Sequence, residues 1–165
     1  AEMPVEEFIA LNPGFSRPII RADLTPRIVL PADRVERFHE NLSKYDDVSV
    51  SSQVFMLGYP SIGIGGAPQI DVTRPLVRGG IVAGVNRSLK TIIIDAPVNH
   101  GNSGGPVVQL SKTNRLRIIG IATQYIPAPE DALPLRSSEA PQVLGNSGYG
   151  VVASSDAIVD LLSTF

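Results

Sequence analysis

Short apolar runs separated by glycine, proline and asparagine fill most of the chain after residue 47. Runs of this length that are rich in β-branched residues predict strands bounded by turns. The predicted strands are Val48–Leu57, Val72–Val85, Thr91–Ala96, Gly105–Leu110, Leu116–Ile126 and Tyr149–Ala153. Glycines interrupt the second of them at positions 79, 80 and 84, which predicts a bulge or a barrel corner. Many short strands at close spacing indicate an all-β sandwich or barrel.

Helical periodicity is limited to two segments, Ala32–Lys44 and Asp156–Leu162. The first carries an apolar stripe along one face, and the second follows serines that can cap a helix. The remainder of the first third is less regular, and there we predict strands over Val5–Leu11 and Pro26–Leu30. The proline- and serine-rich stretch Ile126–Gly145 predicts a long loop.

The composition excludes several classes of function. The chain has 165 residues, of which 43% are hydrophobic and 18% charged, as in one globular domain rather than a disordered segment. Its net charge of −2 provides no basic field for nucleic acid or an anionic membrane, and its apolar runs are too short to span a bilayer. Because it has no cysteine and only two histidines, we expect no disulfide, no bound metal and no cofactor.

The segment with candidate chemistry is Gly101–Pro106, which reads Gly-Asn-Ser-Gly-Gly-Pro between two apolar runs. Its glycines permit positive φ angles, so successive backbone N–H groups can point into one concavity. Such donors stabilise the oxyanion of acyl transfer, for which Ser103 is the candidate nucleophile. The alternative is an ordinary glycine-rich turn whose serine has no catalytic role. Gly145–Gly148 repeats the first four residues without the following Gly-Pro, and we interpret its Ser147 as a turn residue before the last strand.

The Gly101–Pro106 motif resembles the active-site serine loop of trypsin-like serine peptidases, which have the double β-barrel of chymotrypsin. The resemblance is strongest to the bacterial HtrA type and its single-domain relatives. Matching segments follow in the order of that fold: Val54–Pro60, Arg78–Gly84, Ile118–Thr123 and Gly148–Ala153. The resemblance therefore implies an all-β, chymotrypsin-like double β-barrel with a complete C-terminal barrel, a partial N-terminal barrel and a short C-terminal helix.

The resemblance also implies roles for the residues that match it. Ser103 corresponds to the nucleophile, and the backbone N–H groups of Gly101 and Ser103 correspond to the oxyanion hole. The walls of the pocket for the substrate residue before the scissile bond correspond to Pro97, Val98 and Asn99, to Ala122, Thr123 and Gln124, and to Gly148 and Gly150. Since none of these wall residues is charged, we expect a polypeptide substrate with a small or apolar residue at that position.

A serine nucleophile needs a general base, and in this fold a histidine and then an aspartate precede it along the chain. Neither histidine occupies the expected position, because His39 lies in the predicted helix and His100 lies on the serine loop itself. Asp23 is a candidate for the acid, with Glu6 or Glu7 as alternatives in an apolar run. The chain alone is therefore expected to be a poor catalyst.

Residues 1–47 are interpreted as a remnant of the N-terminal barrel with the segment between the barrels, and residues 48–165 as the C-terminal barrel with its helix. The favoured interpretation is a fragment of a serine endopeptidase whose histidine precedes Ala1. The alternative is a catalytically inactive trypsin-like domain that binds peptides. An incomplete first barrel leaves apolar surface exposed, which predicts self-association. The resemblance implies a bacterial protein, either cytoplasmic or exported, and leaves its oligomeric state open.

Overall fold

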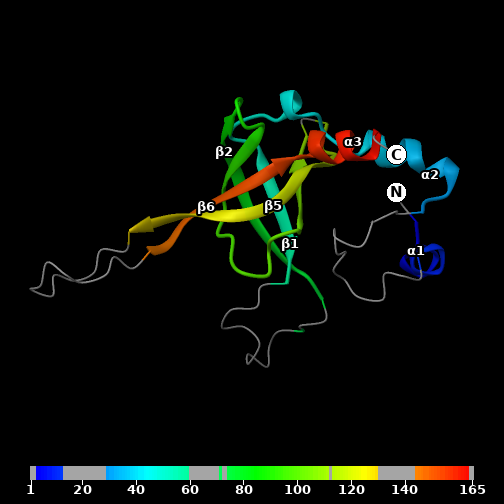
Figure 1. Ribbon diagram of the computed structural model, residues 1–165, viewed down its shortest axis with the longest axis horizontal. Helices are drawn as coiled ribbons and strands as arrows, with labels where there is room; N and C mark the ends of the chain where they lie inside the picture. Colours follow the sequence, from blue (N-terminus) through cyan, green and yellow to red (C-terminus); the bar gives the residue numbers. More distant parts are fainter. Residues whose placement is uncertain are drawn as a thin grey trace, which may run out of the picture. The chain divides into compact units, whose positions relative to one another are not determined.

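Six antiparallel strands of the computed structural model close into a barrel in the order β1-β2-β3-β6-β5-β4 (Figure 1). The structure describes residues 3–12, 29–59, 71, 74–111, 113–129 and 144–163. The strands are β1 (Gln53–Gly58), β2 (Leu76–Asn86), β3 (Thr91–Asp95), β4 (Pro106–Leu110), β5 (Leu116–Pro129) and β6 (Leu144–Ser154), and the helix α3 (Ser155–Ser163) follows. The predicted all-β barrel with a short C-terminal helix is confirmed.

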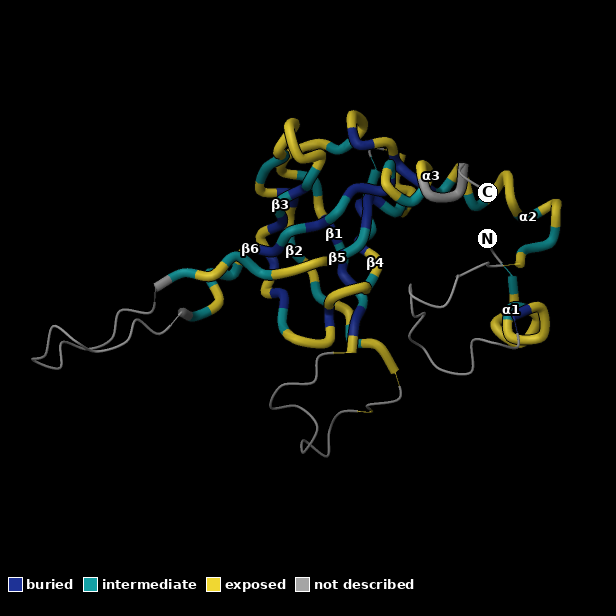
Figure 2. Tube along the Cα trace, in the orientation of Figure 1, coloured by how far each residue is buried: buried dark blue, intermediate teal, exposed yellow. Residues whose placement is uncertain are grey.

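The interior of the barrel is filled by the inward-facing side chains of alternate strand residues. Along β1 and β3, buried residues alternate with more exposed ones (Figure 2). The buried residues are Val54, Met56, Ile92 and Ile94, whose side chains lie on the inner face of the strands. Branched aliphatic residues suit this position because they pack well on a pleated surface. The other buried members of the same cluster are Tyr45, Val82, Ala96, Val98, Val107, Ile119, Ala122 and Val152.

The segment 43–52 closes one end of the barrel. The Ser43 N–H donates to the Ile118 carbonyl at 2.8 Å, and the Tyr45 N–H donates to Oδ1 of Asp156 at 2.9 Å. The Tyr45 side chain packs into the core and is only 6% exposed. A turn with φ of 70° at Ser51 then precedes β1, so the strand predicted from Val48 begins later, at Gln53.

The chain divides into two compact units, residues 1–42 and residues 43–165. In the first unit, α1 (Val5–Leu11) replaces a predicted strand, so that prediction is wrong. Two acidic residues in its first turn favour the positive end of a helix dipole. At its end, the buried Asn12 side chain donates to the carbonyls of Phe8 and Val29 and accepts the Val29 N–H, at 2.7–2.9 Å.

The second predicted helix is confirmed as α2 (Ala32–Glu40), which ends a few residues earlier than expected. The Asn41 side chain and its N–H both donate to the Arg37 carbonyl there, at 2.7 and 3.2 Å. Competition of a short polar side chain for helical carbonyls is typical of a helix end. Most of the strand predicted over Pro26–Leu30 lies outside the described residues, as does Asp23.

The predicted bounds of the loop over Ile126–Gly145 are wrong at both ends. β5 continues to Pro129 and β6 already starts at Leu144, so the two strands extend beyond the barrel as a paired arm (Figure 1). Ser147 consequently lies within β6 and not in a turn before it. The predicted bulge in β2 is confirmed by a register shift between Val82 and Gly84 against β3.

The predicted self-association can be tested on the outer face of β2, where apolar side chains are exposed. Val77 and Ile81 lie on the same face of the strand and are 62% and 43% exposed. We expect the double substitution Val77→Thr, Ile81→Thr to shift the chain toward monomer in sedimentation velocity, because it removes apolar area without breaking the β pairing. A wild-type chain that sediments as a monomer at every concentration contradicts this prediction.

Candidate functional site

The serine loop, residues 96–105, is shaped by a short backbone turn and two left-handed glycines. The Asn102 N–H donates to the Asn99 carbonyl and the Gly105 N–H to the Asn102 carbonyl, each at 3.0 Å. Gly101 and Gly104 have φ angles of 89° and 85°, a region that L side chains rarely adopt. The glycines that suggested a tight turn in the sequence are therefore required by the backbone itself.

Hydrogen bonds to two strands hold this loop in place. The Tyr59 N–H after β1 donates to the Gly101 carbonyl at 3.1 Å. On the other side, the Gly104 N–H donates to the Ala122 carbonyl of β5 at 2.8 Å, and the Ala122 N–H donates to the Gly105 carbonyl at 2.9 Å. A Cβ on Gly105 would lie 2.0 Å from the Leu57 carbonyl oxygen, so only glycine fits this close approach.

Asn102 anchors the loop from inside. Its residue is fully buried, and its Oδ1 accepts the Asn99 N–H at 2.9 Å. Its Nδ2 has no hydrogen-bond partner among the described residues and lies where a Cβ on Gly58 would be, 2.4 Å from that position. The Asn102 amide therefore holds the loop backbone through Oδ1, and the absence of a side chain on Gly58 leaves room for Nδ2.

Ser103 is exposed at the surface of this loop. Its Oγ donates a hydrogen bond to the Thr123 carbonyl of β5 at 2.7 Å, so the structure brings the candidate nucleophile and a predicted wall residue together. The hydroxyl thus donates its hydrogen bond to a backbone carbonyl. The oxyanion role of the Gly101 and Ser103 N–H groups stays a prediction.

The predicted pocket walls also meet around the loop. Val98 is buried, and a Cβ on Gly150 would lie 2.2 Å from Cγ2 of Val98, so these two walls are in direct contact. Gln124 pairs with Val151 in the β5–β6 register, which places the third wall beside the Gly148–Gly150 segment. The structure therefore gathers residues from three separate stretches of the sequence, although their role in binding stays a prediction.

Two residues that hold the first wall were missed by the sequence analysis. Nδ2 of Asn146 donates to the Val98 carbonyl at 2.7 Å, and Nη1 of Arg78 donates to the Pro97 carbonyl at 3.2 Å. No sequence signal marks Arg78 for this contact. Asn146 stands in the repeated Gly-Asn-Ser-Gly segment, which was interpreted only as a turn.

The candidate base and acid residues are placed less favourably. The His100 ring packs edge to face against Tyr125 of β5, with ring centroids 6.3 Å apart and planes at 72°. His39 belongs to α2 in the first unit, where its ring contacts Phe38 with centroids 6.0 Å apart. Glu6 and Glu7 are exposed in the first turn of a helix, which removes the strand context that had suggested them.

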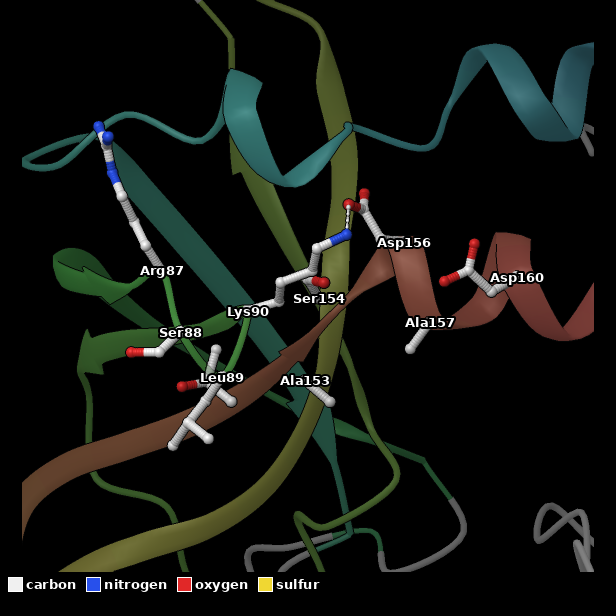
Figure 3. A pocket seen from close by; sticks show the side chains of 10 residues that line it. Arg87, Ser88, Leu89, Lys90, Ala153, Ser154, Asp156, Ala157 and Asp160 are labelled. Atoms are coloured by element: carbon white, nitrogen blue, oxygen red, sulfur yellow. Dashed lines mark ion pairs between the residues drawn. The ribbon is translucent and has the colours of Figure 1, made fainter.

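A separate pocket of about 440 Å³ lies between the β2–β3 turn and α3, and contains none of the predicted site residues. Thr91, at the start of β3, lines it, whereas the serine loop follows the other end of that strand. Nζ of Lys90 and Oδ2 of Asp156 form an ion pair of 3.6 Å inside it (Figure 3). Its mixed charges do not point to a ligand of one chemical class.

Comparisons with known proteins give one family match and one structural match. Residues 1–47 match the family profile described as the LysM-like domain of the lytic transglycosylase MltD. A search of curated proteins found no match. Among solved structures, the HtrA-type protease AlgW with tripeptide matches with a TM-score of 0.50 and 21% identity, over 75% of this chain and 34% of that chain. The present chain thus spans about a third of that protease.

The match to AlgW confirms the trypsin-like barrel fold that the motif order implied. Sequence identity of this level shows the fold and leaves the activity to be proposed. The interpretation of residues 1–47 as a remnant of the N-terminal barrel stays a prediction. The same residues match the LysM-like family profile.

The fit of Asn102 against Gly58 gives a test of the loop. We expect Gly58→Ala to lower the free energy of unfolding by about 1–3 kcal/mol, because the new methyl group overlaps the buried amide. Gly79→Ala is the matched control, since a Cβ there lies 3.9 Å from the nearest atom, on the Phe55 ring. Urea unfolding measures both variants, and equal effects would show that the contact does not constrain the loop.

Proposed function

We propose that residues 43–165 form the nucleophile-bearing barrel of a serine endopeptidase, with Ser103 as the nucleophile. The observation that carries this proposal is the serine loop itself. An exposed serine stands between two left-handed glycines on a protease-like barrel. An idle serine in an ordinary turn does not require the buried amide and close glycine contacts that fix this loop.

In the proposed reaction, Ser103 Oγ forms a bond to the carbonyl carbon of the scissile peptide. Its proton passes to a general base and then to the leaving amine as the C–N bond breaks, which leaves an acyl-enzyme. Water then attacks this ester, takes the acyl group as a carboxylic acid and returns the proton to Ser103. The N–H groups of Gly101 and Ser103 are the proposed donors to the oxyanion in both steps.

The proposal requires a general base beyond the contacts described for the barrel. The Ser103 hydroxyl donates to the Thr123 carbonyl, so activation needs the hydroxyl to rotate from that acceptor to a base. We propose that a histidine of a first barrel, in a part of the protein outside this sequence, supplies it. Without this base, only oxyanion stabilisation and substrate binding remain to accelerate the reaction.

The proposed substrate has a small or apolar residue before the scissile bond. Val98, one of the predicted wall residues, is buried against Gly150, where a Cβ would lie 2.2 Å from Cγ2 of Val98. The wall residues carry no charge that could pair with a basic or acidic side chain. The tripeptide in the AlgW structure supports a peptide ligand for this fold.

A catalytically inactive peptide-binding domain is the second candidate. It is favoured by the Ser103 hydrogen bond to Thr123, which leaves the hydroxyl occupied, and by the ring contact that holds His100 against Tyr125. In this role an extended peptide would pair with the edge of β5 next to the loop. The two candidates differ in whether Ser103 reacts covalently.

We infer a location in the bacterial cell envelope. The support is the match of residues 1–47 to a LysM-like domain described for a lytic transglycosylase. Among the described residues, no helix is long and apolar enough to cross a membrane.

Covalent labelling separates the two candidates. We expect the wild-type chain to react slowly with a fluorophosphonate at Ser103, and Ser103→Ala to abolish the label while leaving the unfolding curve close to that of the wild type. Ser147→Ala is the matched control. Because the serine of this second Asn-Ser-Gly segment is not expected to react, the variant should label at Ser103 to the same extent as the wild type. Intact-mass spectrometry with peptide mapping reads the site. Label on Ser103 excludes the inactive binding domain, whereas label that is equal in the wild type and Ser103→Ala overturns Ser103 as the nucleophile.

A further inference from the structure

We propose that the side-chain hydroxyl of Thr123 positions the candidate nucleophile, because it closes a β-bulge whose backbone carbonyl accepts the Ser103 hydroxyl. The inference rests on the proposed function, since it concerns the same serine. The resemblance in sequence assigned Thr123 only to a wall of the substrate site. The new role belongs to its hydroxyl group and to the irregular strand around it.

Strand β5 carries one extra residue next to the serine loop. Ala122 pairs with Val152 of β6, and Gln124 pairs with the residue directly before Val152. Thr123, which lies between them, therefore has no residue opposite it. An extra residue in one strand of an antiparallel pair is a β-bulge, and a bulge changes the direction in which the groups around it point.

The bulge turns the Thr123 carbonyl toward Ser103. Ala122 exchanges both of its backbone hydrogen bonds with the serine loop, at 2.8 Å from the Gly104 N–H and at 2.9 Å to the Gly105 carbonyl. In a regular antiparallel strand, the next residue directs its backbone groups to the opposite neighbour, which in this barrel is β6. The Thr123 carbonyl instead accepts a hydrogen bond from Ser103 Oγ at 2.7 Å. The extra residue thus gives the candidate nucleophile a partner that a regular strand would not provide.

The side chain of Thr123 ties the bulge back to β6. Its Oγ1 donates to the Val151 carbonyl at 3.0 Å, so a side-chain hydroxyl bridges the two strands where the ladder is irregular. Threonine suits this position because it joins a hydroxyl donor to the β-branched shape that strands favour. Thr123 is therefore held from two sides, by β6 through its side chain and by Ser103 through its carbonyl.

The consequence is a fixed position for the Ser103 oxygen. A hydroxyl donates its proton to one acceptor while its lone pairs stay available. A base can therefore take the proton after the O–H bond rotates away from the Thr123 carbonyl, without displacement of the oxygen. A nucleophile that is already held in place needs less ordering in the transition state. Loss of the Thr123 hydroxyl loosens the bulge and lets the Ser103 side chain sample other rotamers.

Three variants separate the hydroxyl from the other features of Thr123. Thr123→Val keeps the β-branched shape and removes the hydroxyl, whereas Thr123→Ser keeps the hydroxyl and removes the methyl group. Thr91→Val is the matched control, because it removes a threonine hydroxyl at the end of β3 opposite to the serine loop. Urea unfolding measures the overall stability of each variant.

Nuclear magnetic resonance of the full chain tests the role without requiring a reactive serine. We expect the three-bond couplings of the Ser103 Cβ protons to report one χ1 rotamer in the wild type, and averaged rotamers in Thr123→Val. The Gly104 and Ala122 amide protons bond between the serine loop and β5, and their exchange should accelerate about tenfold in Thr123→Val. Thr123→Ser and Thr91→Val should resemble the wild type in both measurements.

The distribution of the exchange change separates positioning from general destabilisation. A substitution that only destabilises the barrel accelerates exchange in β2 and β3 as well, whereas the proposed role confines the change to the bulge and the serine loop. One Ser103 rotamer with wild-type exchange in Thr123→Val overturns the role of Thr123. Equal changes in Thr123→Val and Thr123→Ser overturn it too, because the hydroxyl would then not be responsible.

Labelling kinetics relate the role to the proposed reaction. When the wild type is labelled at Ser103 by a fluorophosphonate, Thr123→Val should lower the maximal labelling rate about tenfold and leave the binding constant of the reagent unchanged. Thr123→Ser should recover most of this loss. The peptidase itself is tested by the label on Ser103, and the Thr123 role by rotamer and exchange, so the failure of one proposal is distinguished from the failure of the other.

Discussion

The whole candidate site depends on one buried side chain, the amide of Asn102. It accepts a hydrogen bond from the backbone of its own loop at one end and fits against Gly58 at the other. Because Oδ1 of this buried amide is satisfied by the Asn99 N–H, a loop conformation that broke this bond would leave a second buried atom of the same amide without a partner. Ser103, the next residue, therefore emerges from the surface at a fixed place beside β5, where its hydroxyl meets the Thr123 carbonyl.

The barrel supports this loop by bringing backbones closer than side chains would allow. Glycine at positions 58, 105 and 150 leaves room for an amide, a carbonyl and a valine methyl group respectively. Two of these contacts join the loop to the end of β1, and the third joins it to β6. Side chains from β2 and β6 then hold the wall formed by residues 97–99.

Local sequence signals predicted the parts of the fold that depend on neighbouring residues. Short apolar runs rich in β-branched residues located the barrel strands, and glycines within one short segment located the serine loop. Contacts between distant segments could not be read in this way, because no local pattern announces that Asn146 will meet Val98. The helix α1 was missed for a different reason: its run of apolar residues is too short to separate helical from strand periodicity.

The segment that enters the barrel unit and the helix that ends it are fastened to each other. Oγ of Ser155 donates to the Ser43 carbonyl, and the Tyr45 N–H donates to Asp156, so both attachment points lie at one end of the barrel. The serine loop belongs to the other end of β3. Both points at which the chain enters and leaves the barrel therefore lie away from Ser103, and the surface proposed to bind a polypeptide stays clear of them.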